Sequence, residues 1–453
     1  MRITIVGGGK VGYTIAENLA NEHHDITVID TNDAVIEKIN EDLDVLCIKG
    51  NGASISVLKE ADTGRADIFI ATTSLDEVNM IACFAAKNLG AKYTIARIRD
   101  YEYSKEVELL TQSLKIDLAI NPEAATAAQI FRTMRFSAAN DVETFHHGRV
   151  ELVGFRARED DFFVNAPLNT IGGRFAGKPL LICTVEHKGE TTIANGSTVI
   201  FPGDRVFIIG TTKEILRFFR EIGRSTQRIR HVFVIGGGRI CTYLSRQLIE
   251  LNMDVKIVEQ DYGKCLGLSE ILPKALIVSG DGTDQDLLET ENITGYDCFL
   301  ALTGRDEDNI IASLFAKKKG VSKVISKVNR QNYFDIIDSL DIDSVVSPKL
   351  TTAYTIIRVV RGILNSHGSK MQALYKIAGG EAEAMEFSVG SSTRYLGTAL
   401  RDLSTKPGIL IAVIIRGGKI IVPEGSDCIM EGDEVIIISK DNTVLDINDI
   451  FAN

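Results

Sequence analysis

The sequence predicts an α/β protein with two doubly wound parallel-sheet domains, each followed by a small β-rich α+β domain. Three observations lead to this prediction. A glycine fingerprint begins at Gly7 and returns at Gly236, 229 residues later. After each copy, short apolar strands alternate with helical segments, and such strands pair in parallel through crossover helices. A segment rich in hairpin turns then follows. We therefore expect four domains, over residues 1–137, 140–224, 229–366 and 370–453.

The two parallel sheets are each expected from six short runs of apolar and β-branched residues. In the first half these are Arg2–Val6, Asp25–Ile29, Val45–Ile48, Ile68–Ala71, Tyr93–Ile98 and Leu118–Ile120, with helices between them, for example Val11–Glu22 and Val78–Leu89. In the second half they are His231–Ile235, Asp254–Val258, Ala275–Val278, Cys298–Ala301, Lys323–Lys327 and Ser344–Val346. The repeated order indicates a duplication.

The small domains are expected to be built from hairpins. The first contains Val150–Arg156, Leu180–Glu186, Thr191–Ile193 and Asp204–Ile209, separated by Lys-Gly, Asn-Gly and Pro-Gly turns, and residues 383–439 restate it. Their apolar alternation fits a half-buried sheet or a dimer face. Nothing in them marks a ligand pocket.

Two helices connect the domain types, over Ala124–Ser137 and Leu350–Asn365, and both carry apolar residues on more than one face. One interpretation is an ordinary crossover helix under the sheet. The other is a helix that packs on another subunit. Arg220–His231 is polar and basic, and we expect it to link the two halves.

Composition excludes several classes of protein. The net charge of −11 argues against a nucleic-acid groove as the main surface. The amino terminus enters a predicted strand directly, unlike a signal peptide, and the chain lacks an apolar run of bilayer length. The seven cysteines contain no Cys-x-x-Cys pair and indicate a reducing compartment. Because the cysteines indicate a reducing compartment, we expect a cytosolic protein. His146 and His147 have no partner at metal-ligand spacing, so we expect no metal site.

The first glycine fingerprint has the context of a Rossmann-like dinucleotide site: a strand before it, a helix after it and Asp30 at the end of the second strand. Gly7 permits the tight turn, Gly9 lets the backbone approach a pyrophosphate, and Gly12 lets the helix pack close to the strand. The same loop adds Gly8, Lys10 and Val11 as expected phosphate contacts. Asp30 can accept hydrogen bonds from ribose hydroxyls, which favours adenosine and NAD(H) over a nucleotide with a 2′-phosphorylated ribose. The alternative is a relic of the fold that binds nothing.

The second fingerprint departs from the first at its third glycine. Its expected ligand contacts are Gly236, Gly237, Gly238, Arg239 and Ile240. Cys241 replaces the third glycine and adds a side chain at the strand–helix contact, whereas Glu259 retains the ribose acceptor. We expect this site to bind more weakly or to prefer another nucleotide.

Further candidate residues follow the third, fourth and fifth strands, where ligands bind in such sheets. They are Asn51, Gly52, Thr72, Thr73 and Arg97 in the first half, and Asp281, Gly282, Thr303 and Lys327 in the second. The cations Arg97 and Lys327 could meet phosphates or a second subunit, or could be exposed structural charges.

The ordered motifs resemble RCK domains, which regulate potassium conductance. The resemblance rests on the paired fingerprints, on Thr72-Thr73 and Leu302-Thr303 followed by x-x-Asp-Glu-x-Asn, and on the turns Asn121-Pro122-Glu123 and Ser347-Pro348-Lys349. The hairpin segments are similar to the companion C-terminal domain of that family, and the match covers essentially the whole chain.

The resemblance implies a peripheral cytosolic subunit on the inner face of the membrane, forming a homo-oligomeric ring, as a dimer or tetramer, beneath a TrkH-like potassium channel subunit. It implies NAD(H), or alternatively ATP or ADP, as the gating ligand, held by the fingerprint residues with Asp30, Thr72, Thr73 and Arg97, and with Glu259 and Thr303 in the second copy. In such domains an acidic residue after the Pro-containing turn can approach the ligand of a neighbouring subunit. Glu123 occupies that position in the first half, whereas the second half has the basic residue Lys349 there.

Two other functions remain open. An NAD-dependent dehydrogenase would use the β-rich domains to bind substrate, but it needs a general acid or base, usually His or Lys, near the nicotinamide. No histidine lies at a strand end facing the fingerprint in the predicted fold. A nucleotide sensor acting on a transporter of another ion is the second alternative.

Overall fold

The computed structural model describes residues 1–100, 103, 106–174, 178–224, 226, 228–338, 340, 342–364, 371–441 and 444–452. The chain divides into two compact units. The first contains Met1–Thr126 and Ser347–Val360, and the second contains Ala127–Val346 and Arg361–Asn453. Among the helices of the described residues, none combines the length and the apolarity needed to span a bilayer.

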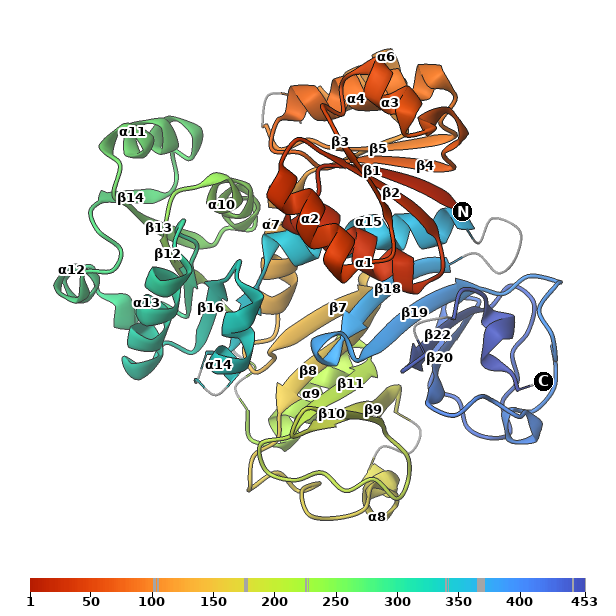
Figure 1. Ribbon diagram of the computed structural model, residues 1–453. Helices are drawn as coiled ribbons and strands as arrows, with labels where there is room; N and C mark the ends of the chain where they lie inside the picture. The colour runs from red at the N-terminus through yellow and green to blue at the C-terminus, as the bar shows by residue number, and fades with distance from the viewer. Residues whose placement is uncertain are drawn as a thin grey trace. The chain divides into compact units, whose positions relative to one another are not determined.

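The first unit holds a six-stranded parallel sheet in the order β3-β2-β1-β4-β5-β6. The strands are β1 Arg2–Val6, β2 Asp25–Asp30, β3 Leu46–Lys49, β4 Ile68–Ala71, β5 Tyr93–Arg97 and β6 Leu118–Ile120. The helices are α1 Lys10–Asn21, α2 Asp33–Asp42, α3 Ile55–Glu60, α4 Asp76–Leu89 and α6 Val107–Ser113. Helices α1 and α2 cover one face, and α3 and α4 cover the other (Figure 1). The predicted doubly wound sheet is confirmed, with strand ends within one residue of expectation.

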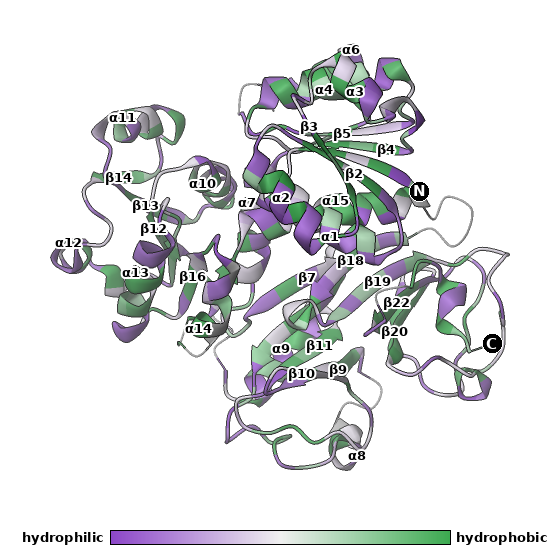
Figure 2. Ribbon diagram, viewed as in Figure 1, coloured by the Kyte–Doolittle hydropathy of each residue, from purple (hydrophilic) through white to green (hydrophobic). Residues whose placement is uncertain are grey.

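The second unit repeats this sheet in the order β14-β13-β12-β15-β16-β17. Its strands are β12 His231–Ile235, β13 Asp254–Glu259, β14 Leu276–Ser279, β15 Cys298–Ala301, β16 Lys323–Lys327 and β17 Ser344–Val346. Its helices are α10 Arg239–Glu250, α11 Tyr262–Ile271, α12 Gln285–Thr290, α13 Asp306–Lys318 and α14 Phe334–Asp338. In both sheets the central strands are continuous apolar runs, because helices bury both of their faces (Figure 2).

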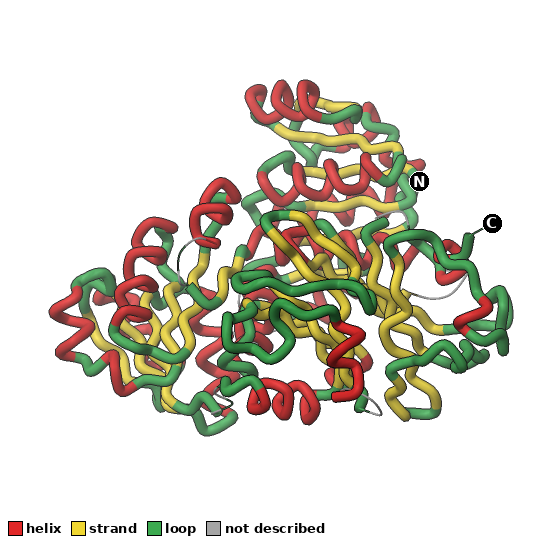
Figure 3. Tube along the Cα trace, turned by 90° about the horizontal axis from the view of Figure 1, so that it is seen from below, coloured by secondary structure: helices red, strands yellow, loops and turns green. Residues whose placement is uncertain are grey.

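The second unit also holds two five-stranded hairpin modules. Figure 3 shows the chain coloured by helix, strand and loop. Module 1 is ordered β10-β9-β11-β8-β7, with β7 Asp141–Phe145, β8 Val150–Arg156, β9 Leu180–His187, β10 Glu190–Ile193, β11 Arg205–Gly210, α8 Leu168–Ile171 and α9 Thr212–Glu221. Module 2 is ordered β18-β19-β22-β20-β21, with β18 Met371–Ile377, β19 Ala382–Ser388, β20 Ile409–Arg416, β21 Lys419–Ile421 and β22 Glu434–Ser439.

The structure corrects the predicted modules at their edges. Strands β7 and β18 were not expected, because their polar residues, such as Glu143 and Lys376, interrupt the apolar alternation. Helix α9 runs to Glu221, so the link between halves is shorter than the predicted Arg220–His231.

The two modules pack on each other through a shared apolar core. It is formed by Phe145, Val150, Leu152, Cys183, Phe207 and Ile209 of module 1 and by Ala373, Ile377, Ala384, Val413, Ile436 and Ile438 of module 2. Of the two interpretations of the apolar alternation, the dimer face is therefore realised within one chain. The burial is non-directional and proportional to area, so it needs only matching apolar faces.

Helices α7 Pro122–Met134 and α15 Pro348–Leu364 leave the half of the sequence in which they begin. Ala127, Ile130 and Met134 of α7 lie in the core of the second parallel sheet, beside Val232 and Leu244. The part of α15 up to Val360 belongs to the first unit, together with the first parallel sheet. Each helix thus packs on the other half of the duplication, which explains its apolar residues on several faces. Asn365, the predicted end of α15, lies outside the described residues.

Candidate functional site

The turn between β1 and α1 uses its glycines for different purposes. Gly7 has a φ of +94°, and a Cβ there would lie 2.9 Å from the amide nitrogen of Thr73. A Cβ at Gly12 would lie 1.9 Å from the carbonyl oxygen of Gly7. At Gly9, by contrast, no described atom lies within 4 Å of that position. Gly7 and Gly12 are therefore required by the fold, whereas Gly9 leaves the turn open to a ligand.

The Asp30 carboxylate holds this turn in place. Its Oδ2 accepts a hydrogen bond from the Gly8 amide at 2.7 Å, and its Oδ1 accepts one from the Asn32 amide at 2.8 Å. Glu259 does the same in the second half, with 2.7 Å to the Gly237 amide and 2.9 Å to the Asp261 amide. Each ionised oxygen retains acceptor capacity for a ribose hydroxyl.

The amino-terminal turns of α1 and α10 carry backbone amides and no acidic side chain of their own. Both helices begin at a glycine without a side-chain cap and have no acidic residue in the first turn. Lys10 and Arg239 are exposed there, whereas Val11 and Ile240 point into the cores. Amide donors, the helix dipole and one cation together favour an anionic group such as a phosphate.

The buried side chain of Asn79 links the ends of β4 and β5 by hydrogen bonds, and we call Asn79 and its counterpart Asn309 the bracket asparagines. Its Oδ1 accepts hydrogen bonds from the Thr73 amide at 2.8 Å and from the Thr73 hydroxyl at 2.7 Å. Its Nδ2 donates to the Arg97 carbonyl at 2.8 Å. Asn309 repeats these bonds with Thr303 and Lys327 at 2.9, 2.8 and 2.9 Å. Both asparagines end the repeated Asp-Glu-x-Asn motif, which by itself assigned them no role.

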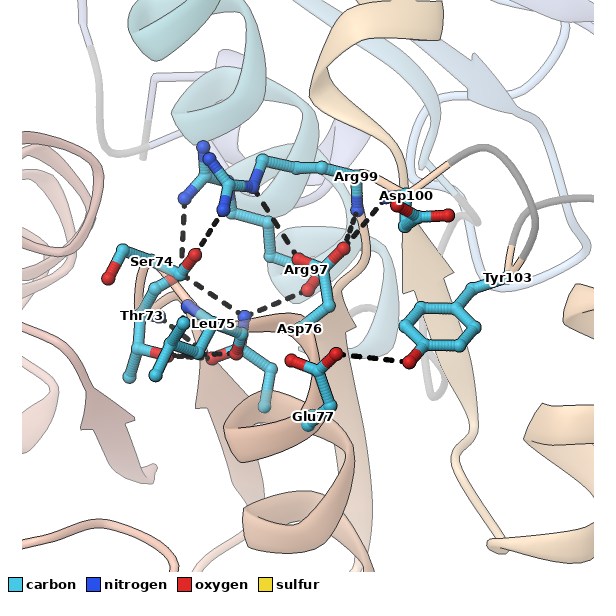
Figure 4. Close-up of polar contacts among 10 residues, drawn as sticks. Thr73, Ser74, Leu75, Asp76, Glu77, Arg97, Arg99, Asp100 and Tyr103 are labelled. Atoms are coloured by element: carbon cyan, nitrogen blue, oxygen red, sulfur yellow. Dashed lines mark hydrogen bonds and ion pairs between the residues drawn. The ribbon is translucent and has the colours of Figure 1, made fainter.

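Asp76 is a second acid that organises this edge (Figure 4). Its Oδ2 accepts hydrogen bonds from the backbone amides of Arg99 at 2.8 Å and Asp100 at 2.7 Å. Asp306 makes the equivalent bonds to Asn329 and Arg330, both at 2.9 Å. Two buried carboxylates therefore fix the loops that follow β5 and β16. The recurrence of Asp76 as Asp306, 230 residues later, was the sequence signal that could have identified these two acids.

The predicted lining threonines contact the protein through their hydroxyls. The buried Thr72 hydroxyl lies 3.2 Å from the Gly7 carbonyl oxygen, to which it donates, and so supports the turn from behind. Leu302 takes its place in the second half. The Thr73 and Thr303 hydroxyls bond to the bracket asparagines. The nucleotide contacts of these threonines remain predictions.

Arginine and lysine side chains gather at this edge in both halves, and in the second half Arg305 and Arg330 pair with Asp308 and Glu307. In the first half Arg97 donates to the Thr73 carbonyl at 3.2 Å, and Arg99 donates to the Ser74 carbonyl, so that both guanidiniums reach one turn (Figure 4). In the second half Lys327 donates to the Leu302 carbonyl at 3.2 Å, and the counterpart of Arg99 is Asn329. Arg99 was not among the predicted site residues, because the repeat has no arginine at the equivalent position.

The loops after β3 and β14 are shaped by packing. A Cβ at Gly52 would lie 2.0 Å from Val6, and one at Gly282 would lie 2.7 Å from Ile235. Asn51 accepts the Ala53 amide at 2.9 Å. Asp281 accepts both the amide and the hydroxyl of Thr283, and these bonds lower the pKa of Asp281. The glycines therefore have a fold reason, and adenine contact at these loops remains a prediction.

Comparison with known families decides what this repeated geometry belongs to. The model of the TrkA-N domain matches residues 3–122 and again 232–348, and that of the TrkA-C domain matches residues 384–452. The chain belongs to the TrkA family. The matched TrkA-N segments contain both glycine turns, both acids and both bracket asparagines.

Relatives in the TrkA family align with the chain from end to end. The Trk system potassium uptake protein TrkA of Halomonas elongata is 34% identical over 97% of this chain and 96% of its own length. The TrkA of Vibrio alginolyticus is 32% identical over 96% of this chain and 95% of its own length, and a TrkA homolog of Archaeoglobus fulgidus is 32% identical over 100% of both.

Solved structures share the fold of this TrkA family member. The GsuK channel bound to NAD has a TM-score of 0.62 at 17% identity and covers 97% of this chain, which spans 76% of that protein. The GsuK RCK domain has a TM-score of 0.61 at 18% identity, with coverage of 97% and 92%. The predicted RCK-type architecture is thus confirmed.

The second turn of this TrkA family member accommodates the side chain that the first cannot. Gly236 has a φ of +90°, and Gly238, like Gly9, has no described atom within 4 Å of its would-be Cβ. Cys241 is buried in the apolar core beneath α10, and burial raises the pKa of its thiol to about 12. The thiol therefore acts as a small apolar group, and the open side of the turn is unchanged.

Exchanging the residues at the third glycine position tests this difference between the turns. Gly12→Cys places a side chain 1.9 Å from the Gly7 carbonyl, so the first turn must move. We expect nucleotide affinity at the first site to fall ten-fold or more, measured by calorimetric titration. Cys241→Gly removes a buried side chain without a clash and should retain binding at the second site, at a stability cost of about 1–2 kcal/mol. Equal affinities in Gly12→Cys and the unchanged protein would contradict the role of Gly12.

Two further features lie outside these turns. Glu123 is partly buried in the first turn of α7, and its contact with a neighbouring subunit remains a prediction. A cavity of about 690 Å³ opens between the modules, lined by Asn169 and Lys178 of module 1 and Lys419 and Asp427 of module 2. No single stretch of sequence marks this cavity, because its lining comes from segments that are distant along the chain.

The structure also brings carboxylates to His146, although the sequence offered no partner at metal-ligand spacing. Glu386 and Glu434 lie 240 and 288 residues further along the chain and contact His146 in the fold. Of the seven cysteines, five are buried and two are partly buried, and all seven are free.

Proposed function

We propose that the chain is a cytosolic, nucleotide-binding regulatory subunit of a potassium uptake system. It binds NAD(H), or alternatively ATP or ADP, and thereby gates a TrkH-like membrane potassium channel subunit from the inner face of the membrane. The observation that carries the proposal is the pair of turns that are open at Gly9 and Gly238 and held by Asp30 and Glu259. The relatives named as potassium uptake proteins support the potassium role.

The ligand class follows from the chemistry of each turn. Free backbone amides at a helix start favour phosphate oxygens, and an acid at the end of the second strand favours ribose hydroxyls. The likeness to GsuK structures with NAD and with ADP supports a nucleotide in this fold.

The proposed mechanism needs no turnover. Nucleotide binding biases two arrangements of a homo-oligomeric ring, and the difference in affinity for them supplies the gating free energy. A coupling of about 1–3 kcal/mol per site is typical, so several sites in one dimer or tetramer shift opening substantially. We therefore propose a binding protein and not an enzyme.

Removing the acid of each turn tests the assignment of the sites. In Asp30→Ala the Gly8 amide loses its acceptor and the ribose loses its partner, so we expect the first site to lose at least ten-fold in NADH affinity. Glu259→Ala is the matched control, since it makes the same change in the second turn. Titration calorimetry reports both affinities and stoichiometry. Unchanged stoichiometry and affinity in Asp30→Ala would exclude the first turn as a nucleotide site.

Potassium flux tests the function itself. The full chain is reconstituted in liposomes with the membrane pore that co-purifies with it, and flux is measured with NAD⁺, NADH, ADP and ATP. We expect flux to depend on nucleotide in the unchanged protein and not in Asp30→Ala, with assembly intact by light scattering. Flux indifferent to all four nucleotides would refute gating. Net oxidation of NADH would instead support the dehydrogenase.

A further inference from the structure

We propose that His146, Glu386 and Glu434 form a binding site for one divalent transition-metal ion, with Zn²⁺ as the best-fitting ion. Each residue offers one ligand atom, and these three atoms all lie within 4.8 Å of one another. His146 follows β7 of module 1, whereas the two glutamates come from β19 and β22 of module 2. A bound ion would therefore join the two modules.

The two glutamates share one face of the module 2 sheet. β19 and β22 are antiparallel neighbours, with Glu386 opposite Ile436 and Glu434 opposite Ser388. Because facing residues of paired strands point to the same side, Glu386 and Glu434 are diagonal neighbours on one face. Ile436 on that face lies in the core shared with module 1, so the carboxylates point at the joint.

Burial creates a demand for positive charge at this place. Glu386 is only 4% exposed, and the side chain of His146 is 14% exposed. The side chain of Glu434 is 32% exposed and gives the site its access to solvent. Two carboxylate groups this close to each other, one of them buried, favour a cation between them.

The imidazole is already oriented toward the carboxylates. Its Nδ1 contacts Glu434, and its backbone amide donates to Glu386 at 3.1 Å. Arg149 Nη1 lies 3.2 Å from Nε2, while its Nη2 donates to the Gly418 carbonyl at 2.6 Å. When a metal binds Nδ1, the neutral imidazole carries its proton on Nε2. Nε2 can then no longer accept a hydrogen bond from the exposed Arg149 guanidinium, so that 3.2 Å contact is lost. One imidazole nitrogen with two carboxylates is a ligand set that Zn²⁺ accepts, whereas Ca²⁺ and Mg²⁺ prefer oxygen alone.

The internal repeat supplies a comparison within the chain. Aligning the module strands places Ala378 where His146 stands, Gly154 where Glu386 stands and Arg205 where Glu434 stands. All three ligands are therefore absent together on the other side of the joint. Arg205 there forms an ion pair with Asp141 of its own module. The duplication alone does not account for a complete set of ligands on one side.

Metal titration of the full chain tests the proposal. Co²⁺, followed by its visible absorption, and Zn²⁺, followed by calorimetry, should each bind at one site per chain. We expect His146→Ala and Glu434→Gln to lower the affinity of that site at least ten-fold. The control Glu381→Gln changes an exposed acid next to β19 and should leave the affinity unchanged.

Glu386→Gln separates metal binding from folding. It removes a buried negative charge next to Glu434, so the metal-free variant should melt at the same temperature as the unchanged protein or higher. Added Zn²⁺ should raise the melting temperature of the unchanged protein but not that of Glu386→Gln. Equal Zn²⁺ affinity in the unchanged protein, His146→Ala and Glu434→Gln would overturn the proposal, as would the absence of a stoichiometric site.

Discussion

Glu383→Ala is expected to destabilise the protein by about 3–5 kcal/mol, because it leaves a buried charge without its partner. Glu383 on β19 and Arg361 in the last turn of α15 are 0% and 1% exposed, and their Oε2 and Nη1 atoms are 2.7 Å apart. Lys376 lies 3.9 Å from the other carboxylate oxygen. The measurement is the midpoint of thermal unfolding together with hydrogen exchange across β19, which should lose protection first.

Two controls distinguish loss of the pair from loss of an acid. Glu381→Ala removes an exposed glutamate two residues away, and we expect a change within about 0.5 kcal/mol. The double variant Arg361→Met with Glu383→Leu removes both charges and should recover most of the lost stability. A double variant less stable than Glu383→Ala would contradict the argument.

Module 1 offers a weaker version of the same pair. Glu151 is fully buried, but its partner Arg135 has a side chain that is 38% exposed, at 2.7 Å. Burial raises the pKa of Glu151 although Arg135 opposes this. Since water screens the partner and the acid is easier to protonate, Glu151→Ala should cost less than Glu383→Ala.

Asn79→Ala is expected to cost about 2–6 kcal/mol in the first parallel-sheet domain and to lower nucleotide affinity there at least ten-fold. The substitution removes the described partner of the Thr73 amide and of the Arg97 carbonyl. Each buried polar group left without its partner costs about 1–3 kcal/mol. The ends of β4 and β5 then lose this side-chain link, and the Thr73 turn, which lies against Gly7, loses its support. Differential scanning calorimetry and nucleotide titration measure the two effects.

Asn309→Ala is the matched variant, because Asn309 makes the same bonds in the second half. It should destabilise the second parallel-sheet domain and leave the first site intact. If both variants weakened the same nucleotide site equally, the two halves would not be separate sites.

The sequence by itself determined the duplication, the two parallel sheets and the two acidic turns. Strand order in these sheets follows local rules, since apolar runs separated by helices permit little other than parallel crossover pairing. The positions of Gly7, Gly12 and Asp30 could be predicted because a turn between strand and helix constrains its own residues.

Tertiary structure alone decided which residues meet across long separations. Asn79 and Asp76 were visible in a repeated motif, but their bonds to the ends of other strands were not. The exchange of α7 and α15 between halves, the cavity between the modules and the approach of Glu386 and Glu434 to His146 depend on packing of apolar faces. Such faces specify how much area is buried but not which partner buries it, so the sequence pattern could not choose between a neighbouring subunit and the other half of the same chain.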